Sequence, residues 1–271
     1  MEQYSGNLEE TVTAATWAKV VHAAETLDVS GPILISSAEE KGFGFEVLGS
    51  LGEGGMGIVD VAKQADLNRE VAIKRSTKGE NSPWAEKLLI EEATLHGQLE
   101  HPNIPPVHML GYDTDGCPAL VMRRIDGVCL KHLIKDDDHP FWSNIRTDRS
   151  EWMLRVLVQV CNAVDYAHSK NILHRDIKTE NIMVGSYGEV FLIDWGVAIQ
   201  LDNNGETWPK DFMGSPRYAA PEMFQDKIPL TKQTDIYLLG ATLVECLTGS
   251  AIHKGKSVAE LIKGSQGLNE N

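Results

Sequence analysis

Residues 174–194 read "HRDIKTENIMVGSYGEVFLID", and the order of residue types in this stretch decides how the chain can fold around it. Two short apolar runs, 182–184 and 190–193, flank the turn-forming sequence "GSYG". If the runs pair as a hairpin, its open end brings Asn181 beside Asp194, although the two residues are distant in sequence. The stretch therefore predicts a carboxamide and a carboxylate lying together at the end of a small hairpin.

The composition is that of a globular protein. Of the 271 residues, 42% are apolar, which is enough for a buried core. The formal net charge is −14 and no Lys/Arg block interrupts it, so nucleic acid is not an expected partner. The four cysteines lack C-x-x-C spacing, and no run approaches the ~20 apolar residues of a membrane span. These features predict packed thiols, no membrane segment and a reducing, cytoplasmic location.

The chain changes character along its length. Residues 1–42 form an N-terminal extension, in which 8–28 carry an apolar stripe at helical spacing that is expected to pack on its own domain or to act as a docking element. Residues 43–125 contain mostly short strand-like runs, and residues 126–271 are mostly helical in pattern. The order predicts an α+β fold of two unlike lobes, a small antiparallel β lobe with one main helix and a mostly helical C-terminal lobe. The expected strands are 45–48, 58–61, 71–73, 107–110 and 118–122, and the expected helices are 84–99, 151–169 and 234–247.

A glycine-rich sequence, "GEGGMG", stands between the first two expected strands, with Gly52, Gly54 and Gly57 in G-x-G-x-x-G spacing. Glycine lets the backbone turn tightly and bring its N–H groups close to phosphates. A dinucleotide-binding interpretation requires a helix directly after the loop, whereas Ile58–Val61 continues as a strand. The setting favours a flap over a nucleotide, with a simple hairpin turn as the alternative.

The sequence "VAIK" adds a cation to the same region. The period of two puts Ala72 and Lys74 on one face of the sheet, under the glycine loop, where an ammonium can meet phosphate oxygens. In the helix that follows, Glu91 and Glu92 both lie near the expected buried stripe of Leu88, Leu95 and Leu99. A carboxylate near a buried face needs a partner, and Lys74 is the obvious cation for either glutamate. Periodicity alone does not choose between them.

The loop before the opening hairpin carries the remaining chemistry. The carboxylate of Asp176 can accept a hydroxyl proton, and the ammonium of Lys178 can offset charge on a transferring phosphoryl group. Asn181 and Asp194 are hard oxygen ligands of the kind that hold Mg²⁺. The combination predicts phosphoryl transfer from ATP to a hydroxyl group.

These residues together resemble the protein kinase family, and within it the eukaryotic-type (Hanks-type) Ser/Thr protein kinases of bacteria. The matching motifs run in family order: "GEGGMGIV", "VAIK", the helix glutamate, "HRDIKTEN", "DWG", "GSPRYAAPE" and "DIYLLG". In this family the glutamate stands nine residues before the His of an H-P-N turn, here His101, which selects Glu92. Lys178 and the pair Gly214–Ser215 resemble the Ser/Thr branch rather than the Tyr branch.

The resemblance implies roles for individual residues. Lys74 would contact the α- and β-phosphates of ATP and pair with Glu92, Asp176 would orient the acceptor hydroxyl, and Lys178 would approach the γ-phosphate. Asn181 and Asp194 would bind Mg²⁺, with Mn²⁺ as an alternative ion. Asp235 would brace the catalytic loop. The positions implied to contact the nucleotide are Leu51, Gly52, Glu53, Gly54, Gly55, Met56, Gly57, Val59, Ala72, Lys74, Met122, Arg123, Ile125 and Met183.

The resemblance also implies regulation by phosphorylation. Arg175, directly before the catalytic Asp, resembles the kinases in which a new phosphate on the activation loop meets an Arg cluster. Thr207 is the expected site of autophosphorylation. Ser215 and Tyr218 are expected instead to contact the catalytic loop and to pack.

The sequence departs from the family pattern at three places. Trp195 replaces the usual Phe, and His96 stands where an apolar residue is usual, so a buried, hydrogen-bonded His96 is expected. Residues 223–271 are shorter than the helices that follow Glu222 in the family, so the C-terminal lobe is expected to be incomplete at its end. The rival interpretations are a catalytically silent, kinase-like scaffold that binds nucleotide or a protein, and a small-molecule phosphotransferase, which would not be expected to carry "GSPRYAAPE". The expected partner of an active kinase is a protein substrate with a Ser/Thr acceptor.

Overall fold

The computed structural model describes residues 44–54, 57–76, 82–113, 116–209, 211–255 and 258–265. The predicted N-terminal helix over 8–28 lies outside the described residues. The chain divides into two compact units. The first contains the described residues up to Gln98 together with Pro105–Ile125, and the second contains Leu99–Ile104 and the described residues from Asp126 onward.

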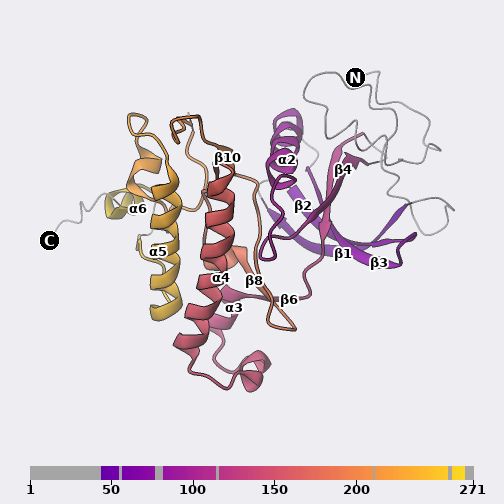
Figure 1. The fold of residues 1–271 in the computed structure, drawn as a ribbon, viewed down its shortest axis with the longest axis horizontal. Helices are drawn as coiled ribbons and strands as arrows, with labels where there is room; N and C mark the ends of the chain where they lie inside the picture. The colour runs from indigo at the N-terminus through magenta and orange to yellow at the C-terminus, as the bar shows by residue number, and fades with distance from the viewer. Residues whose placement is uncertain are drawn as a thin grey trace. The chain divides into compact units, whose positions relative to one another are not determined.

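The first unit is built on an antiparallel five-stranded sheet (Figure 1). Its strands, in their order across the sheet, are β1 (Phe45–Gly54), β2 (Gly57–Gln64), β3 (Arg69–Arg75), β5 (Pro118–Arg123) and β4 (Val107–Tyr112). Val71 and Ile73 of β3 are fully buried in one core cluster, whereas Ala72 and Lys74 point to the other face as the period of two predicts. Each expected strand is therefore present, and most are longer than predicted.

Helix α2 (Ser82–His96) packs against β4 and β5 and is the one main helix described in this unit (Figure 1). The predicted buried stripe is only partly confirmed, because Leu99 is buried but lies beyond the helix, and Leu88 and Leu95 are partly exposed. The face that the helix buries consists of Ala85, Leu89, Glu92, Ala93 and His96. Two alanines on this face let the helix approach closely, which the larger leucines of the predicted stripe would not allow.

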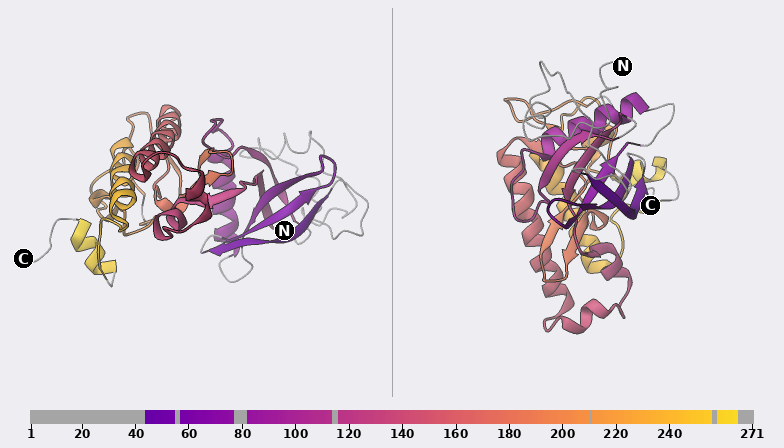
Figure 2. Two further views of the ribbon diagram at one scale, coloured as in Figure 1. Left: turned by 90° about the horizontal axis from the view of Figure 1, so that it is seen from below. Right: turned by 90° about the vertical axis from the view of Figure 1, so that its right-hand side faces the viewer.

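The second unit is mostly helical. Helix α4 (Arg149–Ser169) and helix α5 (Lys232–Thr248) pack side by side, as Figures 1 and 2 show. The Asp148 carboxylate caps α4 by accepting from two backbone N–H groups, and the αL residue Gly249 ends α5. The shorter helices are α3 (Leu130–Lys135), α6 (Val258–Ser265), η2 (Pro140–Asn144), η3 (Thr179–Asn181) and η4 (Pro221–Phe224).

The hairpin predicted from the opening stretch is present. Strand β8 (Ile182–Gly185) pairs with β9 (Val190–Leu192), and β6 (Gly127–Cys129) pairs with the other edge of β8. The pairing extends to the open end, where the Ile193 N–H donates to the Asn181 carbonyl at 2.9 Å. Asp194 is the next residue along, so the hairpin brings the carboxamide and the carboxylate to the same end. A second small sheet joins β7 (Ile172–Leu173) to β10 (Ile199–Gln200).

The described residues confirm the α+β class and the antiparallel β lobe with one helix. All four cysteines are free thiols, but the prediction that they are packed holds fully only for Cys246, which is buried. Cys117 and Cys129 are partly buried, and Cys161 is exposed. Within the described ranges, no helix combines the length and the apolar character needed to cross a bilayer.

Candidate functional site

The first unit holds a buried ion pair. The Lys74 ammonium lies 2.8 Å from Oε2 and 2.9 Å from Oε1 of Glu92, and both residues are buried. The alternative glutamate, Glu91, is exposed and pairs with Lys87 at 3.7 Å. Strand β3 and helix α2 thus supply a fixed ammonium, whose position is set by a buried carboxylate rather than by solvent.

The two described ends of the glycine-rich turn differ in whether the fold requires glycine. Gly57 has φ +142°, and a Cβ there would lie 2.1 Å from the Arg75 carbonyl oxygen, so glycine is required at this position. A Cβ on Gly52 would meet nothing within 4 Å, so packing does not require glycine there and leaves room for a ligand. Gly55 and Met56 lie outside the described residues, and β1 ends at Glu53–Gly54.

Several of the positions implied to contact the nucleotide lie on neighbouring strands of the first unit. Ala72 pairs with Met122 across β3 and β5, and Val59 pairs with Lys74 across β2 and β3. Leu51 is half exposed. The Arg123 N–H donates to the Pro106 carbonyl at 3.0 Å. Ile125 ends the first unit, and Met183 lies on β8 of the second unit.

The loop at residues 174–181, which the resemblance implies to be the catalytic loop, is held from α5. The Asp235 carboxylate, which is fully buried, accepts from the backbone N–H groups of His174 and Arg175 at 2.9 Å each and contacts His168 Nε2 at 2.8 Å. Arg175 has φ +66°, a left-handed conformation that is strained for a residue with a Cβ. The two hydrogen bonds to Asp235 stabilise this strained turn.

Asp176 follows the strained turn. Its Oδ2 accepts from Lys178 Nζ at 2.7 Å and from Asn181 Nδ2 at 3.0 Å. Its Oδ1 is buried and has no hydrogen-bond partner among the residues that the structure describes. A buried carboxylate oxygen without a donor is costly, so it is expected to receive one from a bound molecule.

The residues implied to bind Mg²⁺ provide an amide and a carboxylate. Asn181 also donates Nδ2 to the Asp176 carbonyl at 2.8 Å, so its Oδ1 is the atom left for a cation. Asp194 is exposed and has φ +63°. Among the described residues, no group of three or more His, Cys, Asp or Glu side chains could hold a metal. This donor set suits Mg²⁺, which protein sites often bind through one or two side chains plus substrate phosphates.

Trp195 fixes the backbone beside Asp194. Its indole is fully buried and contacts the His174 ring in a tilted arrangement, with centroids 4.5 Å apart and 59° between the ring planes. It donates Nε1–H to the Leu192 carbonyl at 3.3 Å. Burial lowers the pKa of His174 below its usual value, although Asp235 and other nearby acids oppose this, so a neutral ring is favoured. His96, the other departure from the family pattern, is buried and hydrogen-bonded as predicted, with Nε2 at 2.7 Å from the Pro105 carbonyl oxygen.

The segment Gly214–Glu222 contacts the catalytic loop at its first residues. Lys178 Nζ donates to Ser215 Oγ at 2.7 Å. Gly214 has φ +128°, and a Cβ there would lie 2.7 Å from the Arg175 carbonyl oxygen, so only glycine allows this approach. At the far end Glu222 Oε1 accepts from Thr234 Oγ1 at 2.8 Å. Ser215 therefore contacts the catalytic loop, as predicted.

A buried cluster behind the segment was not anticipated from the sequence. The Glu245 carboxylate accepts hydrogen bonds from the Tyr218 hydroxyl, from Thr179 Oγ1 at 2.6 Å and from Lys131. Burial and the Glu245 hydrogen bond raise the pKa of Tyr218. Burial acts to raise the pKa of Glu180, but hydrogen bonds and Lys131 hold it below its usual value. One feature of the sequence could have predicted this cluster: Glu245 lies on the apolar face of α5, and a buried charge requires a partner.

Arg175 and Thr207 are the residues implied in regulation. The Arg175 side chain is buried and donates Nε–H to the Val197 carbonyl. Burial lowers its pKa to about 10, with Asp235 acting in the opposite direction, so the guanidinium stays charged at neutral pH. Thr207 exchanges two backbone hydrogen bonds with Leu230, at 3.0 and 2.9 Å. The structure gives no contact between Arg175 and Thr207.

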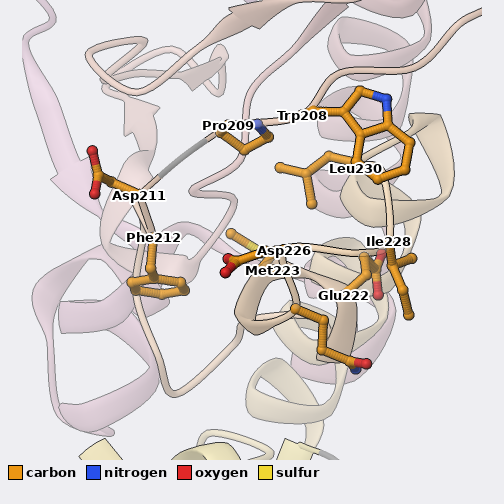
Figure 3. Close-up of a pocket in the computed structure, with 10 residues that line it drawn as sticks. Trp208, Pro209, Asp211, Phe212, Glu222, Met223, Asp226, Ile228 and Leu230 are labelled. Atoms are coloured by element: carbon orange, nitrogen blue, oxygen red, sulfur yellow. The ribbon is translucent and has the colours of Figure 1, made fainter.

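A small pocket lies beside the segment Gly214–Glu222 (Figure 3). Its walls combine apolar side chains with acidic ones from the stretches before and after Gly214–Glu222. The lining residues are Trp208, Pro209, Asp211, Phe212, Glu222, Met223, Gln225, Asp226, Ile228 and Leu230. Phe212 stacks on Phe224, with ring centroids 4.6 Å apart.

Comparison with known families and proteins agrees with this geometry. The family model described as "Protein kinase domain" matches residues 45–267. The chain is 34% identical over 248 residues to a serine/threonine-protein kinase PknD of Protochlamydia amoebophila, which covers 81% of this chain and 24% of that protein. It is 32% identical over 221 residues to the serine/threonine-protein kinase PrkC of Bacillus subtilis, covering 80% of this chain and 32% of PrkC.

A third relative is a serine/threonine-protein kinase PknD of Mycobacterium tuberculosis, 34% identical over 220 residues. The match covers 80% of this chain and 32% of that protein. The chain thus matches about a quarter to a third of the length of these relatives.

Proposed function

Because the chain belongs to the protein kinase domain family, we propose that it is a protein serine/threonine kinase, which transfers the γ-phosphate of ATP to Ser/Thr hydroxyls of a protein and to its own chain. The similarity to three bacterial Ser/Thr kinases supports the acceptor class. The sequence Asp176-x-Lys178 together with Gly214–Ser215 supports it independently.

One observation carries the proposal. Asp176 is a buried carboxylate with one oxygen occupied by Lys178 and Asn181 and the other, Oδ1, without a partner in the described part of the chain. The two hydrogen bonds to Oδ2 restrict rotation of the carboxylate, and this fixes the position of Oδ1. An acceptor hydroxyl donating to Oδ1 would be oriented for attack and would lose its proton to this carboxylate.

The chemistry of the transfer step then suggests roles for Lys178 and Lys74. The acceptor oxygen forms a bond to the γ-phosphorus, the bond from that phosphorus to the bridging oxygen breaks, and ADP leaves. Lys178, 2.7 Å from Asp176, is placed to offset charge on the transferring group. Lys74, held by Glu92, binds the α- and β-phosphates as a fixed point charge.

Asn181 and Asp194 would hold Mg²⁺, or Mn²⁺ in its place. The bound ion would neutralise phosphate charge. Trp195 holds the backbone next to Asp194, and the hairpin β8–β9 holds Asn181, so both ligands come from one rigid local structure. In the first unit, the nucleotide would contact the glycine-rich turn and the positions on β2, β3 and β5 described above, in keeping with the room beside Gly52.

The acceptor protein would bind along Gly214–Glu222. This segment is tied to Lys178 through Ser215, so a peptide lying on it would present its hydroxyl to Asp176. The pocket beside it carries Asp211, Glu222 and Asp226, which together with the net charge of −14 favours basic acceptor proteins. The free cysteines support a reducing, cytoplasmic location for this part of the protein.

The test is transfer of labelled γ-phosphate from ATP to a histone acceptor and to the chain itself, with and without Mg²⁺. The control is Asp176→Asn, which keeps the size of the side chain. Magnesium-dependent transfer that is lost in the control supports the proposal. If the wild type transfers no phosphate while ATP with Mg²⁺ still raises its melting temperature, the protein is a nucleotide-binding scaffold instead.

A further inference from the structure

A histidine outside the motifs contacts the segment Gly214–Glu222. His253 follows α5 and is buried, with 5% of its surface exposed. Its backbone N–H donates to the Arg217 carbonyl at 3.2 Å, and its Nε2 lies 3.1 Å from the Ala219 carbonyl oxygen. One residue thus contacts two alternate carbonyls of the segment.

Tyr237, on α5, also contacts this ring. The Tyr237 hydroxyl lies 3.1 Å from the same Nε2, and the two rings are stacked with an angle of 14° between their planes. A carbonyl oxygen can only accept, so the contact with Ala219 requires the proton of a neutral ring to be on Nε2. The geometry therefore assigns the Nε2–H tautomer, and the Tyr237 oxygen shares this donor.

Side-chain contacts hold three points of the segment, and His253 contacts the backbone between them. Ser215 is tied to Lys178, the Tyr218 hydroxyl to Glu245, and Glu222 to Thr234, each through a side chain. The carbonyls of Arg217 and Ala219 are backbone groups between these points, and Ala219 is fully buried. The Ala219 carbonyl belongs to a fully buried residue, so without a donor from His253 it would be left unsatisfied and the segment would relax to reach another partner.

We propose that His253 is a positioning residue of this segment, which fixes the backbone at Arg217 and Ala219 so that the acceptor protein binds on a preformed surface. This inference rests on the proposed function, in which the segment receives the acceptor. Among the described residues, the contacts of His253 include neither Asp176 nor any position proposed to bind the nucleotide, so we expect its effect to be on acceptor binding and not on the transfer step.

The first test compares two replacements. His253→Phe keeps a ring that can stack on Tyr237 but removes the donor, whereas His253→Gln keeps an N–H donor on a side chain of similar reach. Tyr237→Phe is the matched control, because it removes the hydroxyl from the same cluster and leaves the bond to Ala219. Thermal unfolding establishes that each variant folds.

We expect His253→Phe to raise KM for a histone acceptor about tenfold, the effect of one lost buried hydrogen bond. KM for ATP, and ATP hydrolysis without acceptor, should stay at wild-type values. His253→Gln should restore most of the acceptor KM, and Tyr237→Phe should resemble the wild type. Equal losses of acceptor phosphorylation and of ATP hydrolysis in His253→Phe would overturn the proposal.

Two further readouts do not depend on phosphate transfer. Hydrogen–deuterium exchange should become faster in His253→Phe over residues 214–222 alone, whereas unchanged exchange there would overturn the proposal. Long-range ¹H–¹⁵N spectra of the wild type should show His253 protonated on Nε2, and a ring protonated only on Nδ1 would contradict the inference without any mutation. A wild type that transfers no phosphate would overturn the proposed function, and these two measurements would still decide whether His253 fixes the segment.

Discussion

The carboxylate of Asp235 accepts a hydrogen bond from the backbone N–H of Arg175 at 2.9 Å, across 60 residues of sequence. The bond joins the first turn of α5 to a residue in a strained, left-handed conformation directly before Asp176. The catalytic loop therefore depends on a buried acceptor in a helix that contributes no side chain to the proposed reaction.

The first prediction concerns this acceptor. Asp235→Asn should lower the free energy of unfolding by about 1–3 kcal/mol, because an amide replaces one of its two acceptor oxygens with a donor. It should also lower kcat, since the loop at Arg175 loses support. Urea denaturation and steady-state kinetics measure the two effects. Asp148→Ala is the control, because it removes the oxygen that accepts from two backbone N–H groups at the start of α4, so stability should fall while kcat stays unchanged.

The second prediction concerns the transfer step. Asp176→Asn should lower kcat by about a hundredfold or more, because the amide cannot accept the hydroxyl proton. Lys74→Met should abolish most transfer by removing the cation paired with Glu92. Both variants should fold, which circular dichroism checks. A folded Asp176→Asn protein with unchanged turnover would disprove the catalytic assignment.

The third prediction concerns Trp195. Trp195→Phe keeps a ring on His174 but loses the N–H that donates to Leu192, so the backbone at Asp194 loses one of its supports. The free energy of unfolding should fall by about 1 kcal/mol, and kcat should fall with it. Trp142→Phe removes the same kind of bond, from Trp142 Nε1 to the Asp136 carbonyl, and should cost stability only. Equal kcat in the two variants would argue against a role for Trp195 in holding Asp194.

The fourth prediction concerns regulation. Incubation with ATP and Mg²⁺ should place a phosphate on Thr207, and the Arg175 guanidinium, which stays charged at neutral pH, is the cation expected to meet it. Mass spectrometry of tryptic peptides detects the modification. Thr231 provides an internal control, because it lies at the N-cap of α5 and should stay unmodified. Phosphate found elsewhere but never on Thr207 would count against the assignment.

The fifth prediction concerns pH. Burial lowers the pKa of His253 below the usual 6.5 in the folded protein, although the Ala219 carbonyl opposes this. The unfolded chain therefore binds protons more readily at this residue, and its contribution to stability is present above about pH 6.5 and decreases as the pH falls toward the folded pKa. Urea denaturation between about pH 7.5 and about pH 5.5 should show a smaller loss in His253→Gln than in the wild type. The comparison is needed because His101, His108 and His174 also have lowered pKa values.

Much of the fold followed from local patterns. Short strand-like runs predicted the five strands of the first unit, and helical spacing predicted α4. A helix was also expected where α5 lies, and the turn between two apolar runs predicted the β8–β9 hairpin. The face of α2 was not obtained, because two alanines and a histidine on the buried side carry less apolar signal than Leu88 and Leu95. Close packing against a sheet favours small residues on the buried face of a helix, whereas a periodicity argument is dominated by large apolar residues.

The sequence by itself determined the family, the kinds of element and the motif residues, because these depend on residue type and spacing over short stretches. Periodicity left Glu91 and Glu92 open, the family spacing selected Glu92, and the packing of α2 on the sheet explains why Glu92 is the one buried against Lys74. Only the tertiary structure revealed that Glu245 accepts from Lys131 and Tyr218, and that His253 contacts Ala219. These contacts join residues far apart in the chain. Whether a polar side chain is buried, and which donor meets it there, depends on how the elements pack, and no local pattern records that.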